Sequence, residues 1–492
     1  MSLVQRTFVH RTLVHRTART TILRGLPAAV LLSLHLLIPC ASPGQATQRT
    51  HTSSSKARSL SASDQVAFAA ALKAQDSGDR REAESTLRDL ARRNPNSFEV
   101  AETLGLLYAE SGEFTPAIPF LEKACSLNSS SAIALANLGA AYLKVNREKD
   151  AVPVLTRSVA LDPGNAQTLS SLGTALLQTG RSQQAAAAFA KAASRNPSDP
   201  DLLYNWALAL FNSGQTTTAN EVLSRVSDKD SSSQAQSLLG DIEERQGHYE
   251  QAVAHLQAAA KLDPSEANMY ALGIEFLRHW TFDPAIRIFQ FGLERYPSST
   301  RLLLGLGVAR YSMNDVGLAA PIFSRLLVSD PDNALYAELL GHSCSLMPET
   351  SKGCDKLESF AERHPKNAMV ATYAAANILH RPSTPENASA ARKLLETAIA
   401  DDPHSPEAYY QMGLLEQYQS RWPESIVPLE KAIALKPAFS KAHYRLALAY
   451  SHAGEREKAH QEIALQKQYS QQEKDDLNAK FKEVTTFLVT MH

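Results

Sequence analysis

The chain has 492 residues, of which 44% are hydrophobic and 7% aromatic, and its formal net charge at pH 7 is −1. Glycine and proline, with 21 and 24 residues, are scarcer than in an average protein, which favours helices over a turn-rich β fold. The near-zero charge argues against nucleic acid as the main ligand, because phosphate binding requires clustered positive charge. Four cysteines exclude a disulfide-rich mini-fold, and no apolar run reaches the roughly 18 residues of a membrane-spanning helix.

Residues 1–46 are predicted to be a secretory signal peptide. Five arginines and no acidic residue accompany a short, mainly apolar run over 26–39, and small residues follow as far as Ala46. A basic stretch, a short apolar core and a small-residue exit are the parts of such a signal. We therefore expect an exported protein of the periplasm or cell envelope. An uncleaved signal anchor is the alternative.

Cys40 ends the sequence Leu-Ile-Pro-Cys, which resembles a bacterial lipobox, the signal for attaching lipid to a cysteine. Pro39 departs from that pattern, because glycine, alanine or serine normally precedes the lipidated cysteine. Lipidation at Cys40 is therefore a second possible fate of this segment.

The next segment, residues 47–62, is rich in serine and threonine and poor in large apolar residues. Such a composition cannot bury enough apolar surface to offset the entropy of ordering the chain. We predict a flexible linker.

A repeat of about 34 residues fills the chain from 63 to 473, in about twelve units. Its clearest mark is a small residue after an apolar one, at Gly105, Gly139, Gly173, Ala207, Gly240, Gly273, Gly307, Gly341, Ala375, Gly413 and Ala447. A second series of small residues follows 12 positions later in most units, and a third series, mostly proline, ends the units. Three series with one period indicate a repeat architecture.

Each unit contains two segments of helical length joined by a short polar turn. The small residues allow two antiparallel helices to approach closely, and proline ends the second helix because it lacks a backbone N–H. One helical hairpin cannot bury its apolar face alone, whereas stacked hairpins can. The pattern therefore predicts an all-α solenoid.

These units resemble the tetratricopeptide repeat (TPR) family. The resemblance is dense in LGAAYL at 138–143 and in AVPVLTRSVALDP at 151–163. It implies a right-handed superhelix of antiparallel helix pairs and, together with the signal peptide, an exported bacterial member of the family.

The last 19 residues, 474–492, place apolar side chains on one face of a polar helix, at Leu477, Phe481, Val484 and Leu488. This segment looks like the helix that caps TPR arrays, whose ends need a polar outer face. A helix that docks onto a partner is the alternative.

The repeats leave no separate domain for catalysis. The chain has no Gly-rich phosphate loop, no H-E-x-x-H, no G-x-S-x-G and no C-x-x-C sequence. We expect no enzymatic activity, no cofactor and no metal ion.

Cys344 and Cys354 lie five residues on either side of Glu349, in the turn of one unit. Antiparallel helices joined there would bring the two cysteines face to face, and an exported protein can keep a disulfide. We predict a disulfide. The alternative is a pair of small buried residues.

The TPR resemblance implies that the first helix of each unit lines the concave face. When the small residue is counted as the eighth position, the fifth position faces inward and holds Tyr204, Tyr270, Tyr410 and Tyr444. Tyrosine suits peptide recognition because it combines a large contact area with a hydrogen-bonding tip. Three arginines near this stripe could bind carboxylates, namely Arg278, Arg301 and Arg445. Alternatively, the tyrosines pack against the next helix.

The predicted function is a non-catalytic scaffold that binds peptides or a folded partner on the concave face. Membrane contact is expected only through a lipid or signal anchor at the N-terminus. The alternative function is a lipid-anchored assembly factor for envelope proteins, pili or a secreted polysaccharide.

Overall fold

The computed structural model describes residues 60–227, 229–347 and 353–472. The predicted signal peptide, most of the predicted linker, Cys40 and the predicted capping helix 474–492 lie outside these residues. The described chain is helical and contains no strand. In that part of the chain no helix combines the length and apolar character needed to cross a bilayer.

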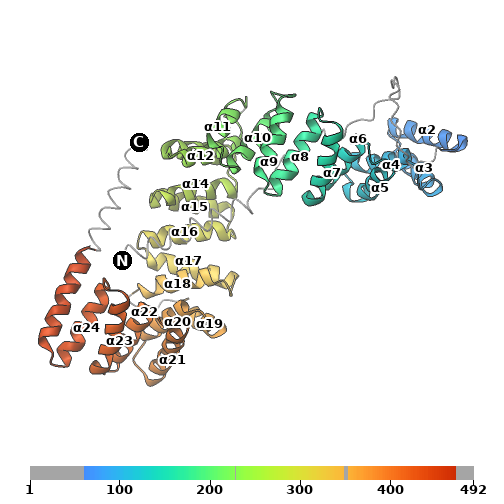
Figure 1. Cartoon of the computed structure of the whole chain (residues 1–492). Coiled ribbons are helices and arrows are strands. Elements are labelled where there is room, and N and C mark those ends of the chain that lie inside the picture. Colours follow the sequence, from blue (N-terminus) through green and yellow to red (C-terminus); the bar gives the residue numbers. More distant parts are fainter. Residues whose placement is uncertain (1–59, 228, 348–352, 473–492) are drawn as a thin grey trace. The chain divides into compact units, whose positions relative to one another are not determined.

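The chain divides into two compact bodies, with the boundary at residues 249 and 250. The helices of the N-terminal body are α2 (Ala62–Asp76), α3 (Arg80–Arg93), α4 (Phe98–Glu110), α5 (Phe114–Leu127), α6 (Ala132–Lys144), α7 (Glu148–Leu161), α8 (Ala166–Gln178), α9 (Ser182–Ala193), α10 (Pro200–Asn212), α11 (Thr216–Ser224) and α12 (Ser233–Gln246). Consecutive helices lie side by side within this body (Figure 1).

The C-terminal body contains α13 (Tyr249–Leu262), α14 (Glu266–Arg278), α15 (Phe282–Arg295), α16 (Thr300–Ser312), α17 (Val316–Ser329), α18 (Ala334–Ser345), α19 (Lys356–Arg363), α20 (Ala368–Leu379), α21 (Pro385–Asp401), α22 (Pro406–Tyr418), α23 (Trp422–Leu435) and α24 (Ser440–His452). A further helix covers 456–472. The predicted all-α array of helix pairs is confirmed in both bodies.

The helix ends follow from the sequence. The side chains of Ser97, Ser131 and Asn165 each accept a hydrogen bond from the backbone N–H three residues further on, at 2.9–3.3 Å. Such caps satisfy N–H groups that have no partner inside the helix. At the other end of a unit, Pro95 and Pro163 follow α3 and α7 by two residues, where they prevent the helix from continuing.

The repeated glycines mark the places where the two helices of one unit touch. A Cβ atom built on Gly173 would lie 2.7 Å from Cε1 of Phe189, and one built on Gly139 would overlap the Leu155 side chain. The close approach expected from the repeat therefore occurs between α8 and α9 and between α6 and α7. A larger residue at either glycine would push the pair apart.

Candidate functional site

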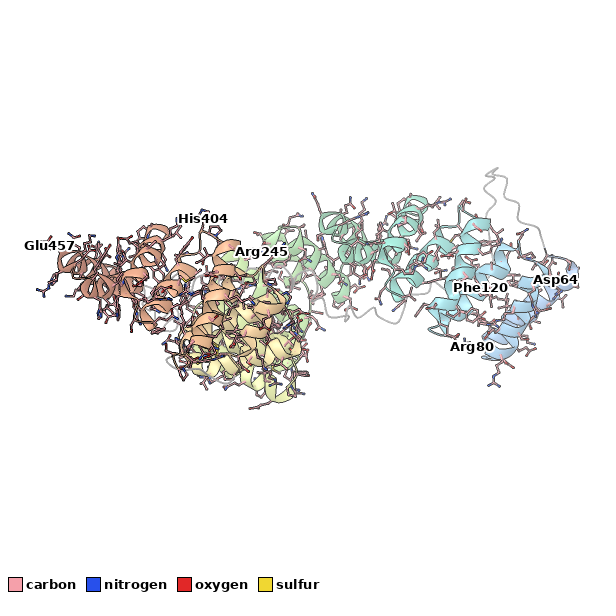
Figure 2. The ribbon with its side chains drawn as sticks, turned by 90° about the horizontal axis from the view of Figure 1, so that it is seen from below. Asp64, Arg80, Phe120, Arg245, His404 and Glu457 are labelled. Carbon is pink, nitrogen blue, oxygen red and sulfur yellow. A yellow bond between two sulfur atoms is a disulfide. The ribbon has the colours of Figure 1, made fainter. Side chains whose placement is uncertain are left out.

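The predicted groove residues all lie on first helices of the repeats, on α10, α14, α16, α22 and α24. Tyr204 belongs to the N-terminal body, and the other six residues belong to the C-terminal body. Tyr204 is half-buried, and burial raises its pKa to about 12. In the same body lies Arg245, which Figure 2 labels. Its guanidinium is 3.6 Å from the centre of the Phe211 ring.

Tyr270 and Arg301 come together, the tyrosine buried and the arginine partly exposed. Tyr270 is buried, and its ring centre lies 6.3 Å from that of Phe289. The Arg301 guanidinium lies 5.6 Å from the Tyr270 ring centre, and its Nε is 3.1 Å from Oε1 of Glu266. Tyr270 thus follows the alternative prediction of packing against neighbouring helices. Arg301 is already paired with a carboxylate of its own chain.

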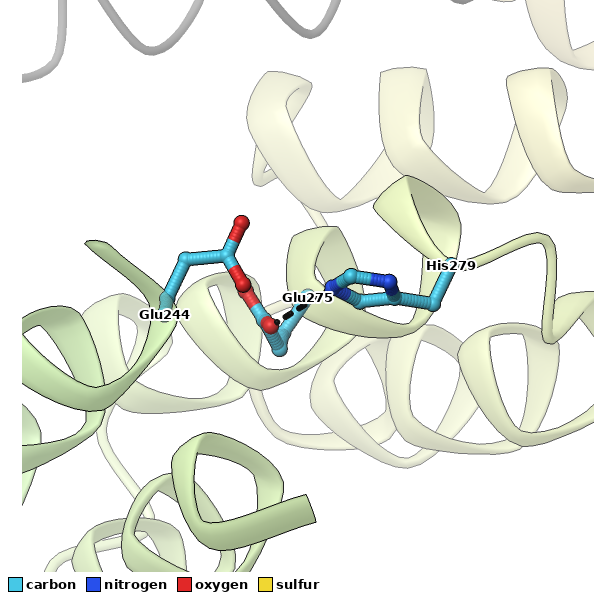
Figure 3. A group of neighbouring side chains, drawn as sticks. All are labelled: Glu244, Glu275 and His279. Carbon is cyan, nitrogen blue, oxygen red and sulfur yellow. Dashed lines mark hydrogen bonds and ion pairs between the residues drawn. The ribbon is translucent and has the colours of Figure 1, made fainter. Parts of the chain in front are cut away.

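Arg278 is also paired. Its Nη1 lies 3.2 Å from Oε2 of the buried Glu275, and Nε2 of His279 lies 3.1 Å from Oε1 of the same carboxylate. Figure 3 shows Glu275 in the last turn of α14 and His279 directly after that helix, with a dashed line between the two side chains. Arg278 and Arg301 thus both meet carboxylates of their own chain, and their binding to a partner's carboxylates stays a prediction.

Tyr410 and Tyr444 occupy equivalent positions in successive units but differ in exposure. Tyr410 is buried against Phe439, with ring centres 5.0 Å apart, and burial raises its pKa to about 12. Tyr444 is 46% exposed. Tyr410 therefore belongs to the core between α22 and α24, and Tyr444 is the exposed member of the pair. A binding role for Tyr444 stays a prediction.

The neighbouring positions of these helices carry residues that the search for tyrosines missed. Met369, Glu407 and Lys441 hold the second position in three successive units, on α20, α22 and α24. Met369 and Lys441 are exposed and Glu407 is half-buried. The repeat register alone could have identified them, because it assigns the second position to the same helix face as the fifth. We call Met369, Glu407, Lys441, Tyr444 and Arg445 the inner stripe.

Glu407 is the acidic group of the inner stripe. Burial raises the pKa of its carboxyl, while a 3.1 Å hydrogen bond from Gln411 and the charge of Lys441 oppose the shift. Lys441 acts on the Glu407 carboxyl through its charge, and Arg445 hydrogen-bonds the Tyr410 hydroxyl. Neither cation makes an ion pair within the described ranges. The stripe therefore offers two cations and an exposed aromatic ring on α24.

Cys344 and Cys354 are joined by a disulfide, with 6.0 Å between their Cα atoms. Cys344 lies in the last turn of α18, and Cys354 lies two residues before α19. Cys125 is a free, half-buried thiol, and burial raises its pKa to about 12. A thiol with a raised pKa is a poor nucleophile, so Cys125 has the properties of a packing residue.

Family models for the tetratricopeptide repeat match residues 68–132, 136–200 and 270–334, residues 176–242, and residues 233–266. These matches cover more than half of the chain. It belongs to the tetratricopeptide repeat family. Comparison with curated proteins gives no match.

Among solved structures, the TPR chain is similar to Naa15/Naa10 bound to HypK-THB, at 16% identity over 82% of this chain and 68% of that one, with a TM-score of 0.32. It is similar to the APC/C hetero-tetramer Cut9-Hcn1, at 13% identity, 83% and 88% coverage and a TM-score of 0.34. It is also similar to MamA from Desulfovibrio magneticus RS-1, at 23% identity over 34% of this chain and 95% of that one, with a TM-score of 0.32.

Proposed function

We propose that this TPR array is a non-catalytic scaffold that binds a protein partner through the inner stripe of α20, α22 and α24. The proposal rests chiefly on Tyr444, an exposed aromatic side chain on the first helix of a repeat, beside two cations without an ion-pair partner in the described chain. Tyrosine and arginine are the residue types most enriched where binding energy concentrates. Lys441 and Arg445 suit a peptide segment that carries carboxylates.

Two tyrosine substitutions test this assignment. Tyr444→Ala is expected to weaken partner binding by about 2 kcal/mol or more, because it removes an exposed anchor, and to leave the thermal melt unchanged. Tyr410→Ala is the matched comparison at the equivalent position and is expected to lower the melting temperature, because its ring is buried against Phe439. Crosslinking in the native cell identifies the partner, and calorimetry then measures its affinity. Unchanged partner affinity in Tyr444→Ala would move the binding surface elsewhere.

We also propose that the mature chain is exported. The Cys344–Cys354 disulfide supports this, because disulfides persist in oxidising compartments. N-terminal sequencing of the native protein is expected to find a chain that begins near Thr47. A chain that begins at a lipid-bearing Cys40 would instead support the lipid-anchored alternative. A native protein that retains Met1 would contradict cleavage.

A further inference from the structure

A groove with a volume of 460 Å³ lies between α21, α22 and α23, which are neighbours near the C-terminal end of the described chain (Figure 1). Its apolar lining comes from all three helices and consists of Ile399, Tyr409, Met412, Val427 and Pro428. Val427 is 72% exposed, although a large apolar side chain at a helix contact is normally covered. None of these residues belongs to the inner stripe.

The groove lies where the apolar core of the C-terminal body is divided. Leu395 and Leu415 belong to one buried cluster, whereas Leu429 and Leu446 belong to another. The second helix α21 follows an inserted turn and has 17 residues, compared with 14 in α23. Along the groove, Ile399, Tyr409 and Met412 are half-buried and pack against the core clusters, whereas Val427 remains exposed.

The charges around the groove are of two kinds. On the α21 side, Nη2 of Arg392 lies 2.6 Å from Oε1 of the buried Glu416, and Arg421 binds the other oxygen at the same distance. The charges of Arg392, Arg421 and Glu416 are therefore paired with one another. On α23, Glu424 and Lys431 line the groove and make no ion pair with any residue that the structure describes. They are seven residues apart, or about 10 Å along the helix.

We propose that this groove binds an amphipathic helix of a partner protein. The apolar stripe of the partner helix lies along Tyr409, Met412 and Val427. A basic side chain of that helix faces Glu424, and an acidic side chain about seven residues away faces Lys431. A helix fits better than an extended peptide, because the walls are helices with no free backbone edge and a bound helix satisfies its own backbone. Methionine adapts to varied apolar side chains, and the two opposite charges set the register.

Three synthetic helical peptides with the same leucine face test the register. They carry Lys and Glu, Lys and Lys, or Glu and Glu at the two flanking positions, seven residues apart. Fluorescence anisotropy measures their binding to the full chain. The wild type is expected to prefer the Lys/Glu peptide by about tenfold, because like charges at an interface repel. Lys431→Glu is expected to prefer the Lys/Lys peptide, and Glu424→Lys the Glu/Glu peptide.

Val427→Asp is expected to lower the affinity for all three peptides by at least about tenfold, since it places a charge in the apolar groove. Val328→Asp, on α17 and 59% exposed, is the matched control and is expected to leave every affinity unchanged. Both side chains are exposed, so the thermal melts should match that of the wild type.

Equal affinities for the three peptides in all variants, or no binding at all, would overturn the proposal. It would also be overturned if Phe481→Asp exposed a binding site that the wild type lacks, because the chain's own C-terminal segment would then occupy the groove. A dimer that Val427→Asp converts to a monomer in light scattering would assign the groove to a second copy. The peptides do not contact the inner stripe, so Tyr444→Ala should leave these affinities unchanged.

Discussion

Replacing Phe289 by alanine is expected to lower the free energy of unfolding of the C-terminal body by about 3–5 kcal/mol. The side chain is 0% exposed and lies between α14 and α16, where a Cβ on either Gly273 or Gly305 would overlap the ring. Two glycines have no side chains that could move into the space left by the ring. The cavity would therefore persist, and its cost adds to the lost burial of the ring.

Phe291→Ala is the matched control for this experiment. Phe291 lies on the same helix, two residues further on, but is 52% exposed. We expect its removal to change the free energy of unfolding by no more than about 0.5 kcal/mol. Urea denaturation followed by circular dichroism measures both variants. Similar losses for Phe289→Ala and Phe291→Ala would show that Phe289 does not hold α14 and α16 together.

The fold could be predicted because the same helix contact is encoded by the same residue pattern in many repeat units. Small residues such as Gly139 and Gly173 recur with one period and meet Leu155 and Phe189, so an error in one unit is corrected by the others. Helix pairs that cannot bury their apolar faces alone must stack, which leaves few arrangements.

The exposure of the site residues could not be predicted in the same way. Tyr410 and Tyr444 have the same position in the repeat, yet α24 and Phe439 cover only the first of them. The cover on Tyr410 comes from Phe439 in the unit that follows it, and the register of one unit does not contain that contact.

The ion pair of Arg278 could be predicted from the sequence, whereas that of Arg301 could not. Arg278 pairs with Glu275 three residues earlier, a spacing that a helix brings together. Arg301 pairs with Glu266, 35 residues away, and that contact depends on how two units stack. The groove beside α21 is harder still to predict from the sequence. The extra residues before α21 can be counted there, but the sequence does not show how the helices pack around them.

Removal of the Cys344–Cys354 disulfide is the other substitution with a large expected effect. In the chain-entropy model, a crosslink between residues 10 apart stabilises the folded state by about 3 kcal/mol, because it restricts the unfolded chain. The crosslink joins α18 to a short helix, since α19 has only eight residues and lies mainly against α20. Leu357, Phe360 and Ala361 are its buried residues.

The double variant Cys344→Ser, Cys354→Ser is therefore expected to unfold at a lower urea concentration than the oxidised wild type, by the equivalent of about 3 kcal/mol. Dithiothreitol should lower the stability of the wild type and leave that of the double variant unchanged. Any remaining difference between the reduced wild type and the double variant measures the effect of serine in the core. Hydrogen exchange should locate the loss in α18 and α19, because a repeat array transmits a local defect mainly to its neighbours. If reduction leaves the wild type's stability unchanged, the α18–α19 hairpin is held by its apolar contacts alone.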